Sequence, residues 1–306
     1  MRSIKMYSMV TAFGVALVPA LAAAQDAPAP APLPAPAPAP AAVPSDTGAA
    51  APAAPAAPAA PTKSINVDVE AASAYVWRGI NLFGANHDSQ DFSLFPSITG
   101  TFGGFTIGYW GAFQLTGNNK GQVVDSGVGA EQDIILGYGG AITDKLSYAA
   151  HLTYWIYPAA KESAAGTKTP MYLEPAVSVL YSTAADLGLQ LTYYRGLEDV
   201  TKPASFIYVN PSIGKTLPIA GDVSLALGLV GGYKIFTNLP DGKKADGSVD
   251  LTFNAGATFP FSDMYVTPGV HAAFLSRADQ AVPGGVAFKD EFIAWAGVHV
   301  GYNVGL

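Results

Sequence analysis

From residue 64 to the end of the chain, apolar residues alternate with polar or small ones in short segments. In the last segment Val300, Tyr302 and Val304 lie at every second position, with Gly301 and Asn303 between them. A period of two places successive side chains on opposite faces of a β-strand. Each segment therefore predicts a strand with one apolar and one polar face.

Twelve segments carry this alternation, and each has the ~9–11 residues that a tilted transmembrane strand needs. They are 65–77, 90–102, 105–115, 130–140, 146–157, 170–181, 187–196, 204–216, 222–235, 248–258, 264–276 and 289–305. Short turns alternate with six longer polar connections between them, such as 116–129 and 238–247. This alternation of short turns and long loops, with an even number of strands, is typical of bacterial outer-membrane barrels.

The composition of the two faces indicates which one meets lipid. The apolar face is rich in Tyr, Phe and Leu, whereas the opposite face is largely Gly, Ala, Ser and Thr. A soluble barrel would turn its apolar face inward, and a soluble sandwich gives no reason for the strict rhythm of turns. After the first 24 residues no apolar run approaches the ~18 residues of a membrane helix. We therefore expect an all-β, closed antiparallel transmembrane barrel of about twelve strands, with small residues favouring an open lumen.

The N-terminal part predicts two further segments. Residues 1–24 resemble a secretory signal peptide, with basic Arg2 and Lys5, an apolar run and an Ala-Ala-Ala cleavage site. Residues 25–63 form a spacer rich in Ala and Pro, which cannot form a sheet or a stable helix. This spacer is either a disordered tail or a tether to peptidoglycan or to a periplasmic protein. The barrel is expected over 64–306.

Charge and composition exclude several classes of function. Without Arg2 and Lys5, 14 of the 16 basic residues remain against 23 acidic ones, a net charge of −9, so we expect no nucleic-acid partner. The chain has no cysteine, which excludes disulfides and thiolate metal sites. It carries no P-loop, dinucleotide fingerprint, EF-hand loop or nucleophile elbow. We therefore predict no cofactor, no metal and no enzymatic activity.

The polar face supplies the candidate residues of the lumen. The acidic ones are Asp68, Glu70, Asp91, Glu131, Asp133, Glu174, Asp250 and Glu291. The others are Arg78, Lys234, His151, His271, His299, Trp110 and Trp155, with further aromatic residues at Tyr157, Tyr172, Tyr194, Tyr208, Tyr265 and Trp295. Excess carboxylates predict an interior that favours cations. Two alternatives remain open: the charges lie at the rims, or they pair off in a plugged core.

Short motifs in the first half of the barrel resemble the TorF-type porin family of Gram-negative bacteria. They are Tyr75-Val76-Trp77-Arg78-Gly79-Ile80, Phe105-Thr106-Ile107-Gly108-Tyr109-Trp110, Glu131-Gln132-Asp133 and Tyr154-Trp155-Ile156-Tyr157-Pro158. The resemblance covers roughly residues 65–200. It implies a barrel and a channel role, and it carries over no functional residues. The C-terminal alternation also resembles the signal read by the outer-membrane assembly machinery, with Leu306 in place of the usual Phe.

The function predicted from these features is passive diffusion of small hydrophilic solutes across the outer membrane, with a weak preference for cations. The lipid of that membrane would surround the barrel, and the spacer would lie in the periplasm. A non-conducting structural or envelope-anchoring barrel is the alternative, and an outer-membrane enzyme is the third. Prolines inside predicted strands remove ladder hydrogen bonds, so we also expect bulges at Pro96, Pro175, Pro211 and Pro268.

Overall fold

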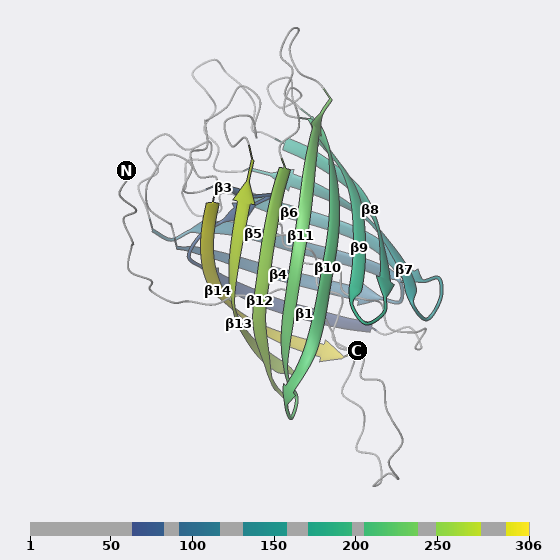
Figure 1. The fold of residues 1–306 in the computed structure, drawn as a ribbon, viewed down its shortest axis with the longest axis vertical. Coiled ribbons are helices and arrows are strands. Elements are labelled where there is room, and N and C mark those ends of the chain that lie inside the picture. Colours follow the sequence, from purple (N-terminus) through teal and green to yellow (C-terminus); the bar gives the residue numbers. More distant parts are fainter. Residues whose placement is uncertain are drawn as a thin grey trace.

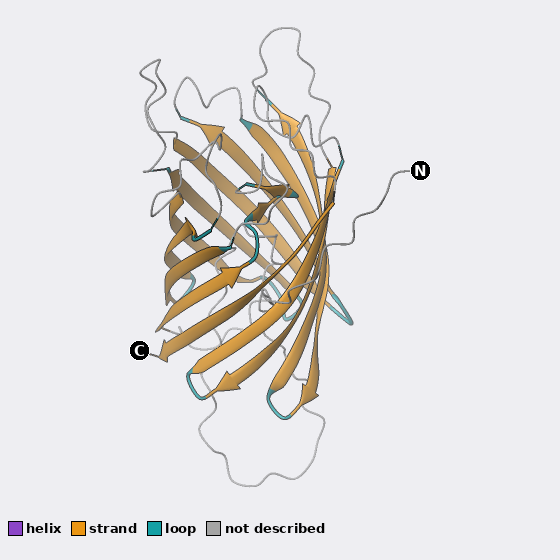
Figure 2. Cartoon of the chain, turned by 90° about the vertical axis from the view of Figure 1, so that its left-hand side faces the viewer, coloured by secondary structure: helices purple, strands orange, loops and turns teal. Residues whose placement is uncertain are grey.

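The described strands form one closed antiparallel β-barrel (Figures 1 and 2). The computed structural model describes residues 63–82, 92–116, 131–157, 171–197, 205–237, 249–276 and 292–305. The segments predicted as signal peptide and, apart from Lys63, as spacer lie outside the described residues, as do parts of the long connections. The barrel strands are β1 (Lys63–Ala72), β4 (Ser93–Phe102), β5 (Phe105–Gln114), β6 (Glu131–Ala141), β7 (Leu146–Ile156), β8 (Met171–Ser182), β9 (Asp186–Gly196), β10 (Phe206–Ala220), β11 (Val223–Phe236), β12 (Val249–Phe261), β13 (Met264–Leu275) and β14 (Phe292–Gly305).

The predicted fold class and strand number are confirmed. Each barrel strand pairs with its two neighbours, and β1 closes the barrel against β14 with Ser64 opposite Gly305. Five short turns lie at the same end of the barrel as Ser64 and Gly305, which we call the short-turn end. The six longer connections leave from the opposite end, the loop end. No helix among the described residues is long and apolar enough to cross a membrane.

The outer surface of the barrel is predominantly apolar. Side chains such as Ile107 and Val177, which are 53% and 56% exposed, have no protein to pack against. Exposed aromatic residues lie toward both ends of this surface: Phe92, Tyr233, Phe274 and Phe292 at the loop end, and Phe102, Phe105, Tyr138, Tyr181, Phe259, Phe261 and Tyr302 at the short-turn end. An apolar band between two aromatic girdles is the surface that spans a membrane.

The bulges predicted at the strand prolines do not occur. At Pro96 the pairing of β4 with β5 is interrupted, but the register is unchanged from Leu94↔Phe113 to Ser97↔Trp110. The same uninterrupted register holds around the other three, which are Pro175, Pro211 and Pro268. The prediction was wrong because each proline removes a donor from one ladder only, and the neighbouring pairs hold the strands in register.

At Pro211 a side chain replaces the missing donor. The Nδ2 atom of Asn210 donates a hydrogen bond to the carbonyl oxygen of Gly231, directly opposite the proline, at 2.7 Å. The one register shift along β10 lies elsewhere, between Pro218 and Ala220 beside the short turn. Local side-chain chemistry, rather than an inserted residue, therefore satisfies the strand at Pro211.

The first strand ends earlier than its alternation predicts. The segment 65–77 is predicted as one strand, and its period of two would place Tyr75 and Trp77 on the same lipid-facing side as Val67 and Val69. Instead β1 stops at Ala72, and both aromatic side chains are buried inside the barrel at 0% and 6% exposure. There β2 (Val76–Trp77) and β3 (Ile80–Asn81) form a separate small hairpin within the lumen (Figure 2). The prediction failed because the alternation of apolar and polar residues is the same whether the chain continues as a wall strand or folds back into the lumen.

Candidate functional site

Residues 73–82 form what we call the inner hairpin, which enters the lumen from the loop end of β1. The backbone of Val76 lies opposite Asn81, and Trp77 lies opposite Ile80. The two turn residues between them, Arg78 and Gly79, both have positive φ, at 49° and 79°. Two successive positive φ values are the geometry of a two-residue type I′ turn. The turn carries Arg78 to the tip of the hairpin, away from the wall that it came from.

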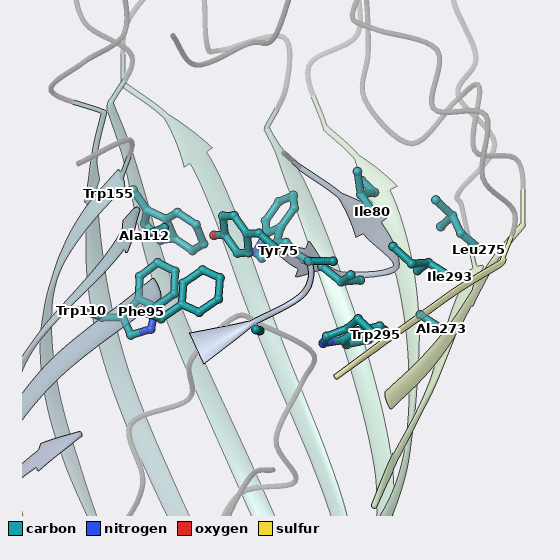
Figure 3. Close-up of a cluster of buried hydrophobic side chains, with 14 of the residues drawn as sticks. Tyr75, Ile80, Phe95, Trp110, Ala112, Trp155, Ala273, Leu275, Ile293 and Trp295 are labelled. Atoms are coloured by element: carbon teal, nitrogen blue, oxygen red, sulfur yellow. The ribbon is translucent and has the colours of Figure 1, made fainter. Parts of the chain in front are cut away.

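Aromatic side chains of the barrel wall surround the inner hairpin (Figure 3). The ring of Tyr75 packs against Phe95 and Trp110, with centroids 5.3 and 5.7 Å away. The ring of Trp77 packs against three wall rings, those of Trp155, Tyr194 and Phe206, at 5.3–5.9 Å. All these side chains are at most 6% exposed, so the hairpin fills the lumen at this level.

The far side of the inner hairpin contacts the last strands of the barrel. A Cβ atom on Gly79 would lie 3.3 Å from Leu275 on β13, which shows how closely the turn approaches that strand. Ile80 belongs to the same buried cluster as Leu275 and Ile293 (Figure 3). The hairpin therefore reaches across the lumen, from the aromatic side chains of β4–β10 to β13 and β14.

The guanidinium group of Arg78 is the buried charge at the tip of the hairpin. One of its nitrogens donates to the Oε2 atom of Glu174 on β8 at 2.8 Å, and both side chains are 4% exposed. The same group lies 4.5 Å from the ring centroids of Trp77 and Tyr208, and somewhat farther from two other rings, those of Phe206 and Tyr194. Charged and aromatic partners together compensate for the burial of this cation.

Other ionisable groups of the wall also bind the hairpin or lie beside it. The Tyr75 hydroxyl is 3.0 Å from both carboxylate oxygens of Glu131. The Lys234 ammonium donates to the backbone oxygen of Arg78 at 3.2 Å. The carboxylate of Asp250 accepts a 2.8 Å hydrogen bond from a wall tyrosine, Tyr208. Three predicted residues, Glu131, Lys234 and Asp250, therefore hold the hairpin or line the wall beside it.

Toward the short-turn end the lumen contains a different polar cluster. The carboxylate of Asp68 accepts a hydrogen bond from Tyr265 at 2.8 Å and lies 2.9 Å from Nδ1 of His299. The other imidazole nitrogen is 3.6 Å from Glu70. Asn66 donates to Asn303 across β1 and β14 at 2.8 Å. These groups pair with one another within the wall, and none of these bonds involves the inner hairpin.

The remaining predicted lumen residues lie apart from the Arg78 contacts. The ring of His271 stacks on Trp295 at 4.9 Å, and Asp133 is buried on β6 beside Trp110 and Trp155. His151 lies half-buried on β7. Among the described residues no group of three or more His, Asp or Glu side chains is placed to hold a metal ion. Asp91 and Glu291 lie outside the described residues.

Sequence reasoning missed the apolar residues that face the lumen. Four of them are buried against the inner hairpin: Phe95, Phe206, Leu275 and Ile293. The expectation that small residues keep the lumen open is wrong at this level, because a large apolar residue was assumed to face lipid. The sequence does contain a signal for such residues. Phe95 and Phe206 are large apolar residues at positions that the alternation assigns to the polar face of their strands. A large apolar residue on the lumen-facing side of a strand indicates that another apolar segment packs against it inside the barrel.

Comparison with solved structures finds other outer-membrane barrels. The similar structures include the KdgM porin in complex with disordered oligogalacturonate, at 12% identity and a TM-score of 0.45 over 78% of this chain and 98% of that one. The NanC porin has 11% identity and a TM-score of 0.43, over 79% and 99%. No family model matches the sequence, and no curated protein matches it. Similarity at this level identifies neither a family nor a solute, and the TorF-type resemblance rests on its short motifs alone.

Proposed function

We propose that the protein is a narrow outer-membrane channel for small hydrophilic solutes, weakly selective for cations, in which the inner hairpin forms the constriction. The barrel would lie in the outer-membrane lipid, inserted by the assembly machinery, with residues 25–63 on the periplasmic side. A tether from this spacer to peptidoglycan or to a periplasmic protein remains part of the proposal.

The observation that carries this proposal is the contrast between the two faces of the wall. The outer face is an apolar band, whereas the inner face carries hydrogen-bonded polar groups along its length. Between the hairpin and the short-turn end, lumen residues such as Asn66, Thr106, Gly137 and Gly228 are small or polar and partly exposed. A polar interior inside a lipid-facing barrel is the arrangement that conducts hydrophilic solutes.

The charge of the interior supports the preference for cations. Six carboxylates occupy the described interior: Asp68, Glu70, Glu131, Asp133, Glu174 and Asp250. One arginine and one lysine side chain oppose them in the described interior, Arg78 and Lys234, besides three histidines. Rings of carboxylates raise the local concentration of cations and repel anions.

The test is planar-bilayer conductance of the refolded full chain across a potassium chloride gradient. The proposal expects discrete, short-lived conductance steps, because ions pass only while the hairpin is displaced, and a reversal potential of the sign given by cation selectivity. An anion-selective reversal potential would overturn the charge argument. The absence of any step from protein shown to be folded by its heat-dependent gel mobility would overturn the channel.

A second candidate is a non-conducting structural barrel, and burial of the inner hairpin favours it. Tyr75 and Val76 are 0% exposed, and Ile80 is 1% exposed. A segment packed as tightly as a protein core closes a lumen for as long as it stays in place. The channel and the structural barrel therefore differ in one property, which is whether the hairpin leaves its position. An outer-membrane enzyme is the third candidate, and no observation in the described residues favours it.

A further inference from the structure

The Arg78 guanidinium occupies a cage whose walls belong mainly to the barrel. Glu174 supplies the carboxylate, and Tyr194, Phe206 and Tyr208 supply rings whose centroids lie 4.5–5.7 Å from the guanidinium carbon. These four residues come from β8, β9 and β10, which are consecutive strands. Only Trp77, at 4.5 Å, comes from the hairpin itself. The wall therefore carries most of this cage independently of the segment that fills it.

The turn of the hairpin gives no reason for an arginine at position 78. Type I′ turns favour Asn-Gly or Asp-Gly, because Asn, Asp and Gly tolerate positive φ better than other residues. Arg78 adopts a φ of 49° in this turn. A side chain that is unfavourable for the local backbone and fully engaged with the wall is held there by the cage, not by the turn.

The chemistry of the cage defines the class of ligand that it accepts. Aromatic faces attract cations through their quadrupoles, and they favour flat or weakly hydrated cations. A carboxylate adds charge-assisted hydrogen bonds to the N–H groups of a guanidinium. A small organic cation with a guanidinium group therefore offers the wall the same contacts as Arg78.

We propose that this cage, formed by Glu174, Tyr194, Phe206 and Tyr208, is a binding site for small guanidinium compounds, and that Arg78 is its built-in occupant. An external guanidinium competes with Arg78 for the cage. Its binding releases the tip of the inner hairpin. Arg78 and an external guanidinium cannot occupy the cage together, because Arg78 already pairs with its one carboxylate, that of Glu174, and lies against its rings.

Binding at the cage does not depend on conduction, but the consequence of release rests on the proposed channel. If the hairpin is the constriction, guanidinium compounds open the lumen for their own passage or for that of other solutes. The geometry links ligand and gate through one residue, since Arg78 lies at the tip of the hairpin and in the centre of the cage. Two kinds of measurement, one of binding and one of conductance, therefore separate the two proposals.

The test compares methylguanidinium with methylurea, its neutral isostere, on the refolded full chain. Hydrogen exchange of residues 73–82 should become faster with methylguanidinium and stay unchanged with methylurea at the same concentration. The Arg78→Asn variant keeps a residue that favours the turn and vacates the cage. Calorimetry should show that this variant binds methylguanidinium about tenfold tighter or more, because the wild-type cage is available only when Arg78 leaves it.

Two further variants complete the binding test. Adding Glu174→Gln to Arg78→Asn should abolish the gained affinity, since the carboxylate of the cage is lost. Arg195→Asn is the matched control, because that arginine is exposed on the outer face of β9, and it should bind as the wild type does. Folded Arg78→Asn protein that binds no tighter than wild type, or binds methylurea equally well, would overturn the cage.

Conductance then separates the cage from the channel. Methylguanidinium binding without any conductance in any variant would retain the cage and remove the proposed channel. Conductance steps with no methylguanidinium binding to Arg78→Asn would retain the channel and remove the cage.

Discussion

The two ends of this lumen are built from the same twelve strands, yet they are filled in opposite ways. At the loop end, wall rings such as those of Phe95, Trp155 and Phe206 pack against the inner hairpin and are at most 3% exposed. At the short-turn end, hydrogen-bonded polar groups such as Asp68 and Asn66 remain partly exposed. The strands thus supply a uniform outer surface, while the inner surface changes character along the barrel axis.

This difference shows how a barrel of intermediate size can be closed without being filled by its own wall. Eight strands leave an interior that side chains fill, and sixteen leave an open channel. Here side chains of the wall and of the inner hairpin pack together at the loop end. The closure is therefore carried by ten residues, 73–82, and we expect it to be separable from the stability of the barrel.

Trp77→Ala should have the largest effect among single substitutions, because it removes the ring at the centre of the loop-end packing. Trp-to-Ala changes in cores cost about 3–5 kcal/mol. Here the loss should appear as undocking of the hairpin, measured as faster hydrogen exchange in residues 73–82. The barrel strands should keep their protection. Simultaneous loss of protection in β1 and β14 would mean that the hairpin and the barrel are one cooperative unit.

Glu174→Gln should loosen the hairpin less than Trp77→Ala does. Breaking a buried ion pair costs about 3–5 kcal/mol when a charge is left without a partner. Glutamine still accepts a hydrogen bond from Arg78, so the cost should fall below that range. Cation selectivity should decrease, as measured by the reversal potential, because one carboxylate is lost and Arg78 keeps its charge. An unchanged reversal potential would show that ions do not pass this carboxylate.

Gly301→Ala should destabilise the short-turn half and leave the hairpin docked. A Cβ atom at this position would fall on the ring of Tyr265, which lies opposite on β13. Displacing that ring breaks its hydrogen bond to Asp68, and overpacking of this kind costs about 1–3 kcal/mol. Thermal unfolding followed by gel mobility measures the loss.

Gly228→Ala is the matched control for this change, because its Cβ would meet no atom within 4 Å. The control should unfold at the wild-type temperature. Faster exchange of residues 73–82 in Gly301→Ala would contradict the independence of the two halves.

Asn210→Ala should have the smallest effect of the four. It removes the amide that donates to the Gly231 carbonyl in place of the proline nitrogen. The loss of one such hydrogen bond costs about 1 kcal/mol. Ser212→Ala is the comparison, since that hydroxyl has no hydrogen-bond partner among the described residues. Equal unfolding temperatures for the two variants would show that the amide does not stabilise the strand.

The wall of the barrel could be predicted from the sequence because lipid imposes one rule on every strand. An outward side chain must be apolar wherever it contacts the membrane, so the period of two persists from β1 to β14. The predicted strand 130–140 differs from β6 by a single residue at each end. Pairing between neighbours then follows from the short turns, which permit only antiparallel contacts.

The inner hairpin could not be predicted in this way, because its apolar side chains are buried against other side chains inside the barrel and do not face lipid. Its residues Tyr75 and Trp77 continue the alternation of β1, and nothing in their spacing reveals that the chain has turned inward. Arg78-Gly79 was the available clue, since a glycine at the second position of a two-residue turn permits the positive φ that a hairpin needs. The ion pair between Arg78 and Glu174 could not be predicted either, because the number of residues between them does not tell how far apart they lie in the folded barrel.

The most direct test of this account is the conductance of a barrel that lacks its inner hairpin. Residues 74–81 are replaced by a flexible Gly-Ser linker, and the refolded variant is compared with the full chain in planar bilayers under a potassium chloride gradient. The account predicts larger and more persistent conductance steps that remain cation-selective, because the carboxylates of the wall lose the opposing charge of Arg78. A folded variant that conducts no better than the wild type would contradict the claim that the hairpin closes the lumen.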